Sequence, residues 1–155
     1  MKASKNQKQA KHASHNKPRD REIRHKTEPG NFRKQKPAWN FRLIDHGCSW
    51  DFKQLSHEKL WDDIFAKLKD YETMTWQEIL DASGGRKKGN NNHPVPIEKL
   101  IPPARKRLKE LRLNDISHLF SLRLTSEIRI WGILDGFVLK LLWYDSGHQV
   151  CPILK

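Results

Sequence analysis

The sequence predicts an α+β fold, in which a small antiparallel sheet packs with one face against two or three helices. Near the C-terminus, between residues 119 and 144, apolar residues alternate with polar ones in three successive segments, which is typical of a β-meander. Ahead of the meander, the segments 56–70, 76–82 and 102–112 have apolar residues at helical spacing. The segment 39–44 alternates and is expected to form a leading strand of the same sheet.

The last two strands of the meander are expected to form a hairpin. The pair Asp-Gly at 135–136 lies between two long apolar runs, and this pair favours a two-residue loop because both loop positions need positive φ. The sequence therefore predicts that residues 127–134 pair with residues 137–144. In this register Gly132 lies opposite Leu139.

The first strand of the meander is expected over 119–124, and its register against the hairpin follows from its apolar residues. A slip of one residue would turn every side chain to the other face. Alternation therefore places Leu122 beside Ile130 on the apolar face. It also places Arg123 and Arg129 together on the opposite face.

That opposite face is predicted to carry a mixture of cations, aromatic rings and aliphatic residues. Its members on the hairpin are Arg129, Trp131, Ile133, Val138, Lys140, Leu142 and Tyr144. Arginine pairs bind phosphates in a bidentate manner, and aromatic rings such as Trp131 and Tyr144 can stack on bases. Lys140 and Trp131 are therefore candidate nucleic-acid contacts. The alternative is an ordinary surface, with the arginines paired to Glu127 or Asp145.

The predicted helices carry their own start signals. Ser56 is expected to cap the first helix, and Thr75 with Glu78 forms a capping box before the second. The apolar face of the first helix consists of Leu60, Trp61, Ile64, Phe65, Leu68 and Tyr71. Trp61 and Trp143 are expected in the core. The other four tryptophans, Trp39, Trp50, Trp76 and Trp131, could instead mark a protein-binding surface.

Charge divides the chain into two parts. The net charge is +12, and residues 1–37 hold 12 Lys and Arg against 3 Asp and Glu, which leaves 18 against 15 for residues 38–155. Residues 1–37 contain almost nothing to bury, so we expect a disordered basic tail followed by one domain over 38–155. The tail is either an arm that contacts phosphates or ribosomal RNA, or a solvated segment that aids solubility.

A second basic segment is the loop 84–93, which contains Arg86, Lys87 and Lys88 between glycines and asparagines. These three residues are candidate nucleic-acid contacts. The loop lacks the GK[ST] ending of a phosphate-binding loop. A plain surface loop is an equal alternative.

The sequence has no apolar run long enough for a transmembrane helix and no apolar stretch behind Met1 that would act as a signal. The two cysteines, at 48 and 151, do not make a disulfide framework, which is typical of a cytoplasmic protein. We expect no membrane partner, no cofactor and no metal. One alternative is a zinc site formed by His46, Cys48, His148 and Cys151, although their spacing matches no known finger.

From Trp39 to Cys151 the chain resembles the RelE/ParE-like toxin superfamily of bacterial toxin–antitoxin modules. The resemblance is most specific in the meander. It consists of the sequence SLRL at 121–124, the pair RI at 129–130, and the sequence LWYD at 142–145 with His148 after it.

This resemblance implies that Arg123, Arg129, Tyr144 and His148 line an RNA site. It also implies a toxin that binds RNA, with cleavage of mRNA at the ribosome as one expected activity, and a small acidic antitoxin as partner. His148 would be the proton donor or acceptor, since histidine titrates near neutral pH. The alternatives are a non-catalytic nucleic-acid or ribosome-binding module, or a protein-partner module of the same fold.

Overall fold

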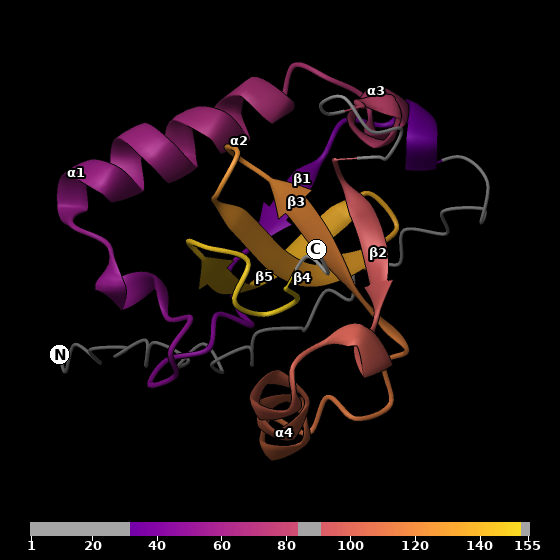
Figure 1. The fold of residues 1–155 in the computed structure, drawn as a ribbon. Coiled ribbons are helices and arrows are strands. Elements are labelled where there is room, and N and C mark those ends of the chain that lie inside the picture. The colour runs from indigo at the N-terminus through magenta and orange to yellow at the C-terminus, as the bar shows by residue number, and fades with distance from the viewer. Residues whose placement is uncertain (1–31, 84–90, 153–155) are drawn as a thin grey trace, which may run out of the picture.

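The computed structural model describes residues 32–83 and 91–152, which form an α+β fold around a five-stranded sheet (Figure 1). The strand order is β1-β5-β4-β3-β2. The strands are β1 Ala38–Asn40, β2 His93–Pro96, β3 His118–Arg123, β4 Arg129–Asp135 and β5 Val138–Asp145. The predicted fold class and meander are confirmed, and the leading strand is present but covers residues 38–40 instead of 39–44. The sheet is mixed rather than antiparallel, because β1 runs parallel to β5.

One strand was not predicted. β2 pairs antiparallel with β3 along the outer edge of the sheet, with Val95 opposite Leu119. Two of its four residues, Pro94 and Pro96, are prolines, which are uncommon in strands, so the sequence did not indicate a strand here. Prolines are tolerated there because β2 is an edge strand and needs ladder hydrogen bonds on one side only.

The first helical segment consists of α1 (His57–Lys59), a π-helical turn (Leu60–Phe65) and α2 (Ala66–Tyr71). The predicted cap is confirmed, since Ser56 Oγ accepts a hydrogen bond from Lys59 N at 3.2 Å. The core position predicted for Trp61 is wrong, because its side chain is 56% exposed. A π turn changes the angular spacing of side chains, so a face drawn with a 3.6-residue period does not hold across it.

Two further helices follow, α3 (Trp76–Asp81) and α4 (Pro102–Glu110). The predicted capping box of α3 is present, with Thr75 and Glu78 bonded to each other's backbone N–H. Residues ahead of the predicted domain start also contact this helix. The carbonyl of Gln35 accepts a hydrogen bond from Trp76 N at 2.9 Å, although residue 35 lies in the predicted tail.

Both faces of the sheet are covered, whereas the sequence predicted helices on one face only. On one face, Ile64 and Leu68 of the first helical segment and Trp76 and Ile79 of α3 belong to one apolar cluster with strand residues. Those strand residues are Phe120, Leu122, Ile130, Leu139 and Leu141. Figure 1 shows α4 at the opposite end of the molecule from α1–α3.

The second apolar cluster lies on the other face of the sheet and includes Leu108 of α4. Its other buried members are Trp50, Val95, Leu100, Ala104, Leu119, Trp131, Leu142, Trp143 and Val150. The core position predicted for Trp143 is confirmed. The mixed face that the sequence predicts as open is therefore buried over most of its length.

The hairpin register differs from the predicted one. Asp135 pairs with Val138, so the two-residue loop is Gly136-Phe137, and Gly136 has a φ of 58°. Gly132 lies opposite Leu141 instead of Leu139, and the register shifts by one residue between Trp131 and Gly132. Beyond this β-bulge, residues 143–145 of β5 point to the face opposite to the predicted one. The alternation of polar and apolar residues does not reveal a bulge.

Candidate nucleic-acid interface

Arg123 and Arg129 lie directly opposite each other at the end of the β3–β4 ladder. Their predicted placement on one face is confirmed, and so is the pairing of Leu122 with Ile130. Both guanidinium groups donate to the carbonyl of Thr125 in the connecting loop, from Arg123 Nε at 3.0 Å and from Arg129 Nη1 at 2.8 Å. The loop therefore brings two cations together at one point.

Residues far away in the sequence hold this pair in place. Asn91 Oδ1 accepts a hydrogen bond from Arg123 Nη1 at 2.5 Å, and Asn92 Oδ1 accepts one from Arg123 N at 2.8 Å. Asn92 is 1% exposed and also donates to the carbonyl of Ile79 at 2.9 Å. The Tyr71 hydroxyl donates to the carbonyl of Arg123. The end of α2 and the segment before β2 therefore meet at the arginine pair.

The sequence did not single out these supporting residues. Tyr71 has the signature of an ordinary core position on an amphipathic helix, and Asn91 and Asn92 lie in a run typical of a loop. Burial raises the pKa of Tyr71, with the hydrogen bond of Asn92 and the two arginine charges acting in the opposite direction. The hydroxyl therefore stays protonated at neutral pH and acts as a donor.

No carboxylate of the described residues contacts the arginine pair directly. Among the described residues, neither guanidinium forms an ion pair, and both side chains are half-buried. Burial lowers the pKa of Arg129, and the charge of Arg123 lowers it further, while Asp145 raises it. Two like charges in direct register repel each other.

Asp145 lies opposite Arg129 on β5, but its oxygens are engaged elsewhere. It is fully buried and accepts hydrogen bonds from Trp131 Nε1 at 3.2 Å and from three backbone N–H groups. Those N–H groups belong to Gly147 at 3.2 Å, Gln149 at 2.9 Å and Val150 at 3.1 Å. Asp145 therefore fixes the turn that follows β5.

This turn carries His148 to the β3–β4 loop. His148 has a φ of 56°, a conformation uncommon for residues other than glycine, asparagine and aspartate. Its Nε2 lies 3.1 Å from the carbonyl of Ser126. Because Thr125 and Ser126 are consecutive, the imidazole and both guanidinium groups contact the same short loop. Three of the four predicted catalytic residues therefore contact the β3–β4 loop.

The fourth, Tyr144, lies elsewhere, and its predicted position beside the arginines is wrong. The bulge in the β4–β5 ladder turns Tyr144 to the face that packs against the first helical segment and α3. It is 8% exposed, its ring centroid lies 6.1 Å from that of Phe52, and burial raises its pKa. The aromatic hydroxyl beside the arginine pair is that of Tyr71.

Two predicted nucleic-acid contacts are also displaced. Trp131 is 3% exposed and donates to Asp145, so its ring is not available to stack on a base. Lys140 lies toward the far end of β5 and makes an ion pair with Asp135 at 2.7 Å. Asp145 lies five positions further along the strand, or about 17 Å at roughly 3.3 Å per position. Residues 86–88 lie outside the described residues.

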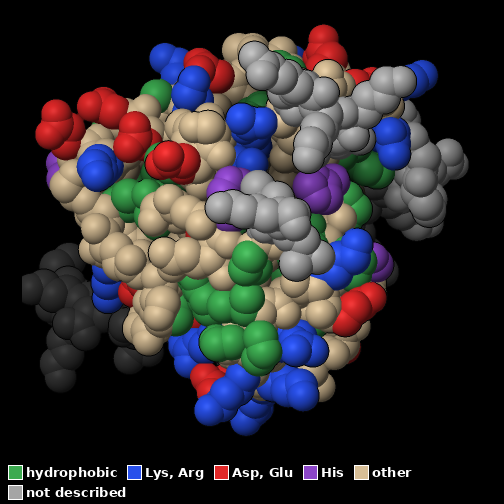
Figure 2. Space-filling model, in the orientation of Figure 1, with side chains coloured by type: hydrophobic (Ala, Val, Ile, Leu, Met, Phe, Trp, Pro, Cys, Tyr) green, Lys and Arg blue, Asp and Glu red, His purple; other side chains and the backbone are tan. Residues whose placement is uncertain are grey.

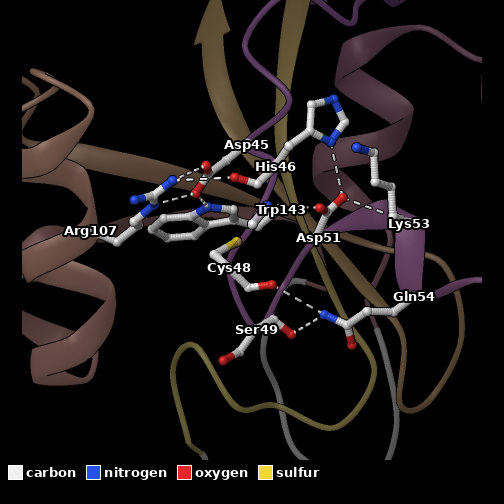
Figure 3. A network of polar contacts seen from close by, with 10 residues as sticks. Asp45, His46, Cys48, Ser49, Asp51, Lys53, Gln54, Arg107 and Trp143 are labelled. Atoms are coloured by element: carbon white, nitrogen blue, oxygen red, sulfur yellow. Dashed lines mark hydrogen bonds and ion pairs between the residues drawn. The ribbon is translucent and has the colours of Figure 1, made fainter.

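A second polar cluster lies under α4, around the buried carboxylate of Asp45 (Figure 3). Asp45 accepts from Arg107 Nε at 2.8 Å and Nη2 at 2.6 Å, and from Trp143 Nε1 at 3.0 Å. Burial acts to raise the pKa of Asp45, but these hydrogen bonds and one from Cys48 outweigh it, so the pKa is lowered. Burial and the nearby Asp45 raise the pKa of Cys48 to about 11. This cluster attaches α4 to the sheet.

The four residues of the zinc alternative contact different partners. His46 Nδ1 lies 3.1 Å from Asp51, while Cys151 Sγ lies 3.5 Å from the carbonyl of Lys99. Cys48 adjoins Asp45, and His148 contacts the β3–β4 loop. Across the described ranges, no three His, Cys, Asp or Glu side chains are grouped as metal ligands would be.

Comparison with protein-family models, with curated proteins and with solved structures finds no match for this chain. The resemblance to RelE/ParE-like toxins therefore stays a prediction. In the part of the chain that the structure describes, no helix has the length and apolar character needed to cross a membrane.

Proposed function

We propose that this protein binds RNA and holds a backbone phosphate between Arg123 and Arg129. The observation that carries the proposal is the uncompensated charge of this pair, which the β3–β4 loop and Asn91 hold in place. An anion between the two guanidinium groups would relieve their repulsion. Phosphate suits them best, because the planar arginine fork matches its geometry and cannot lose its proton at physiological pH.

Both side chains retain donors for such a ligand. Within the described residues, Arg123 uses Nε and Nη1, and Arg129 uses only Nη1, which contacts the carbonyls of Thr125 and Ile128. One guanidinium nitrogen of Arg123 and two of Arg129 therefore remain for a phosphate. The fixed positions lower the entropy lost on binding.

The chain as a whole has the charge of an RNA-binding protein. Residues 1–37 carry a net charge of +9, from 12 Lys and Arg against 3 Asp and Glu, and would add sequence-independent affinity for phosphates. RNA or the ribosome is accordingly the proposed partner. A small acidic antitoxin, implied by the family resemblance, would be a second partner able to cover this charge.

Cleavage of the bound RNA is a second candidate function, and the position of His148 favours it. His148 and the arginine pair contact consecutive carbonyls of one loop. A 2′-hydroxyl attacking the adjacent phosphate must lose a proton, and the leaving 5′-oxygen must gain one. His148 would transfer protons, while Arg123 and Arg129 would stabilise the charge that develops on the phosphate.

The binding proposal is tested by fluorescence anisotropy with a labelled single-stranded RNA. Arg123→Gln and Arg129→Gln should each weaken binding by about 10- to 100-fold, since a hydrogen bond to a charged group contributes about 1.5–3 kcal/mol. Arg42→Gln is the matched control, because Arg42 is exposed and lines a hollow with Arg107 and Leu111 instead of contacting the β3–β4 loop. Equal losses in all three variants would contradict a site at the arginine pair.

Cleavage is tested separately with His148→Asn. Asparagine tolerates the positive φ at this position and cannot transfer protons at neutral pH, so the fold is kept while the chemistry is removed. We expect the rate to fall about 10²–10⁴-fold with RNA affinity nearly unchanged. If the wild-type protein binds RNA without cleaving it, the cleavage proposal is wrong and only the binding proposal stands.

A further inference from the structure

A second positive region lies on α4 and the residues that flank it. Residues 97–113 hold six Lys and Arg and two Glu, a net charge of +4, whereas the whole of residues 38–155 has a net charge of +3. Figure 2 shows Lys and Arg gathered at the lower end of the molecule, where Figure 1 places α4. The net positive charge of the domain is thus concentrated on one helix.

Only one of the six cations of residues 97–113 is engaged in ion pairs within the described residues. Arg107 contacts Asp45 and Glu110, and so attaches α4 to the sheet. The other five, namely Lys99, Arg105, Lys106, Lys109 and Arg112, have no carboxylate within ion-pair distance there. Four of them are exposed, and Arg105 is half-buried.

Their spacing keeps these charges together. Lys109 follows Lys106 by three residues and Arg105 by four, so their side chains are neighbours on the helix surface. Like charges at this spacing destabilise a helix. An external anion would relieve this repulsion.

The anion would be held by side chains and not by the helix terminus. α4 begins with Pro102 and Pro103, which have no N–H to offer a ligand. A surface hollow of about 470 Å³ borders the cations, and Arg105, Lys106 and Lys109 are among its lining residues. The three cations outnumber the one carboxylate of the lining, Glu98, and the remaining lining residues are Asn114 and the apolar Ile97, Pro102, Leu108, Leu113 and Ile116.

This lining identifies the kind of nucleic acid. Among the described residues that line this hollow there is no aromatic ring on which an unpaired base could stack. Base-paired RNA is bound through its phosphates and shape, without such stacking. We infer that the exposed cations of α4 bind the phosphate backbone of a base-paired RNA segment, independently of its sequence. This inference rests on the proposed RNA binding and adds a second site to it.

The test compares two triple variants that remove the same charge. In the first, Lys99→Gln, Lys106→Gln and Lys109→Gln neutralise three exposed lysines of the α4 region. Affinity for a labelled RNA duplex is measured between about 50 and 200 mM salt, where each phosphate contact adds about 0.9 to the slope of log affinity against log salt. We expect this slope to fall by about 2 to 3, with an unchanged thermal midpoint.

The matched control is Lys59→Gln, Lys67→Gln and Lys69→Gln on the first helical segment, where Asp and Glu are abundant (Figure 2). Its slope should fall by less than about 1, because these lysines would contact no phosphate. Equal slopes for the two variants would overturn the α4 site and would assign its charge to general attraction or to an acidic protein.

This failure is distinguishable from failure of the proposed function. If wild-type protein binds duplex and single-stranded RNA, but the α4 variant matches the wild type, only the α4 site is wrong. If Arg123→Gln behaves like Arg42→Gln while the α4 variant loses duplex binding, only the phosphate site at the arginine pair is wrong. Absence of any RNA binding by the wild type overturns both.

Discussion

The buried carboxylate of Asp45 should contribute more to stability than any exposed charge of the domain. Asp45→Asn keeps the size of the side chain but removes its charge. The new amide NH₂ must then face a donor of Arg107 in either orientation, because Arg107 donates to both carboxylate oxygens, and in one orientation it also faces Trp143 Nε1. One favourable contact becomes a repulsive one.

The expected loss can be worked out from burial. Breaking a fully buried ion pair costs about 3–5 kcal/mol. The Asp45 side chain is 1% exposed, whereas the Arg107 side chain is 28% exposed. In the Asp45→Asn variant the Arg107 guanidinium therefore regains part of its hydration. We therefore expect the free energy of unfolding to fall by about 2–3 kcal/mol, or roughly 8–12 °C in thermal midpoint for a domain of this size.

Arg107 supplies its own control, because it also contacts Glu110 at 2.9 Å. The Glu110 side chain is 46% exposed, so Glu110→Gln should cost less than about 1 kcal/mol. Both variants lose one carboxylate from one arginine, and they are compared by urea denaturation. Equal losses would refute the view that burial makes the Asp45 contact important.

The same carboxylate gives a pH dependence. Its pKa in the folded protein is lower than in the unfolded chain, so its contribution is fully present above the unfolded pKa of about 4 and is lost as the pH falls through the folded value. The wild type should therefore lose stability below about pH 4 more steeply than Asp45→Asn. Parallel acid denaturation curves would contradict this reasoning.

Three further predictions concern the fold and its thiols. Gly132→Ala should lower the free energy of unfolding by about 1–3 kcal/mol, because a Cβ at this position would lie 2.4 Å from the carbonyl oxygen of Lys140. An unchanged midpoint in urea denaturation would contradict this close approach. Trp61→Ala should leave the thermal midpoint nearly unchanged, since this ring is 56% exposed, whereas Trp76→Ala should cost about 3–5 kcal/mol; similar losses would contradict their different burial. Cys48 should react slowly with iodoacetamide at neutral pH, because its pKa is about 11; a rate equal to that of a free thiol would show that it is neither buried nor affected by Asp45.

The sequence predicted the β3–β4 register correctly and the β4–β5 register incorrectly, for one physical reason. β3 alternates clearly near its end, where Leu122 and Arg123 differ in polarity, so only one parity buries the apolar residues. On β5 both faces are buried, as the burial of Leu141 and Leu142 shows. A strand that is apolar on both faces gives no signal for a bulge.

The candidate site was predictable only in part. Alternation places Arg123 and Arg129 on one face, and the family resemblance implied His148 beside them; all three contact the β3–β4 loop. Tyr71 and Asn91 were missed because they approach from distant segments, and no local pattern marks a residue for a contact made across the fold. Tyr144 was misplaced by the bulge, which lies two residues before it in β5.

The two positive regions of the domain differ in a way that bears on their proposed roles. Arg123 and Arg129 are half-buried and held by hydrogen bonds, so their charges are screened weakly by salt and lose little entropy on binding. Exposed side chains such as Lys106 and Lys109 are screened strongly and carry more rotamer freedom. The arginine pair is therefore suited to fix one phosphate in place, and α4 is suited to attract and retain the rest of the RNA. This division explains why the α4 contribution should dominate the salt dependence, while the arginine pair should dominate affinity at high salt.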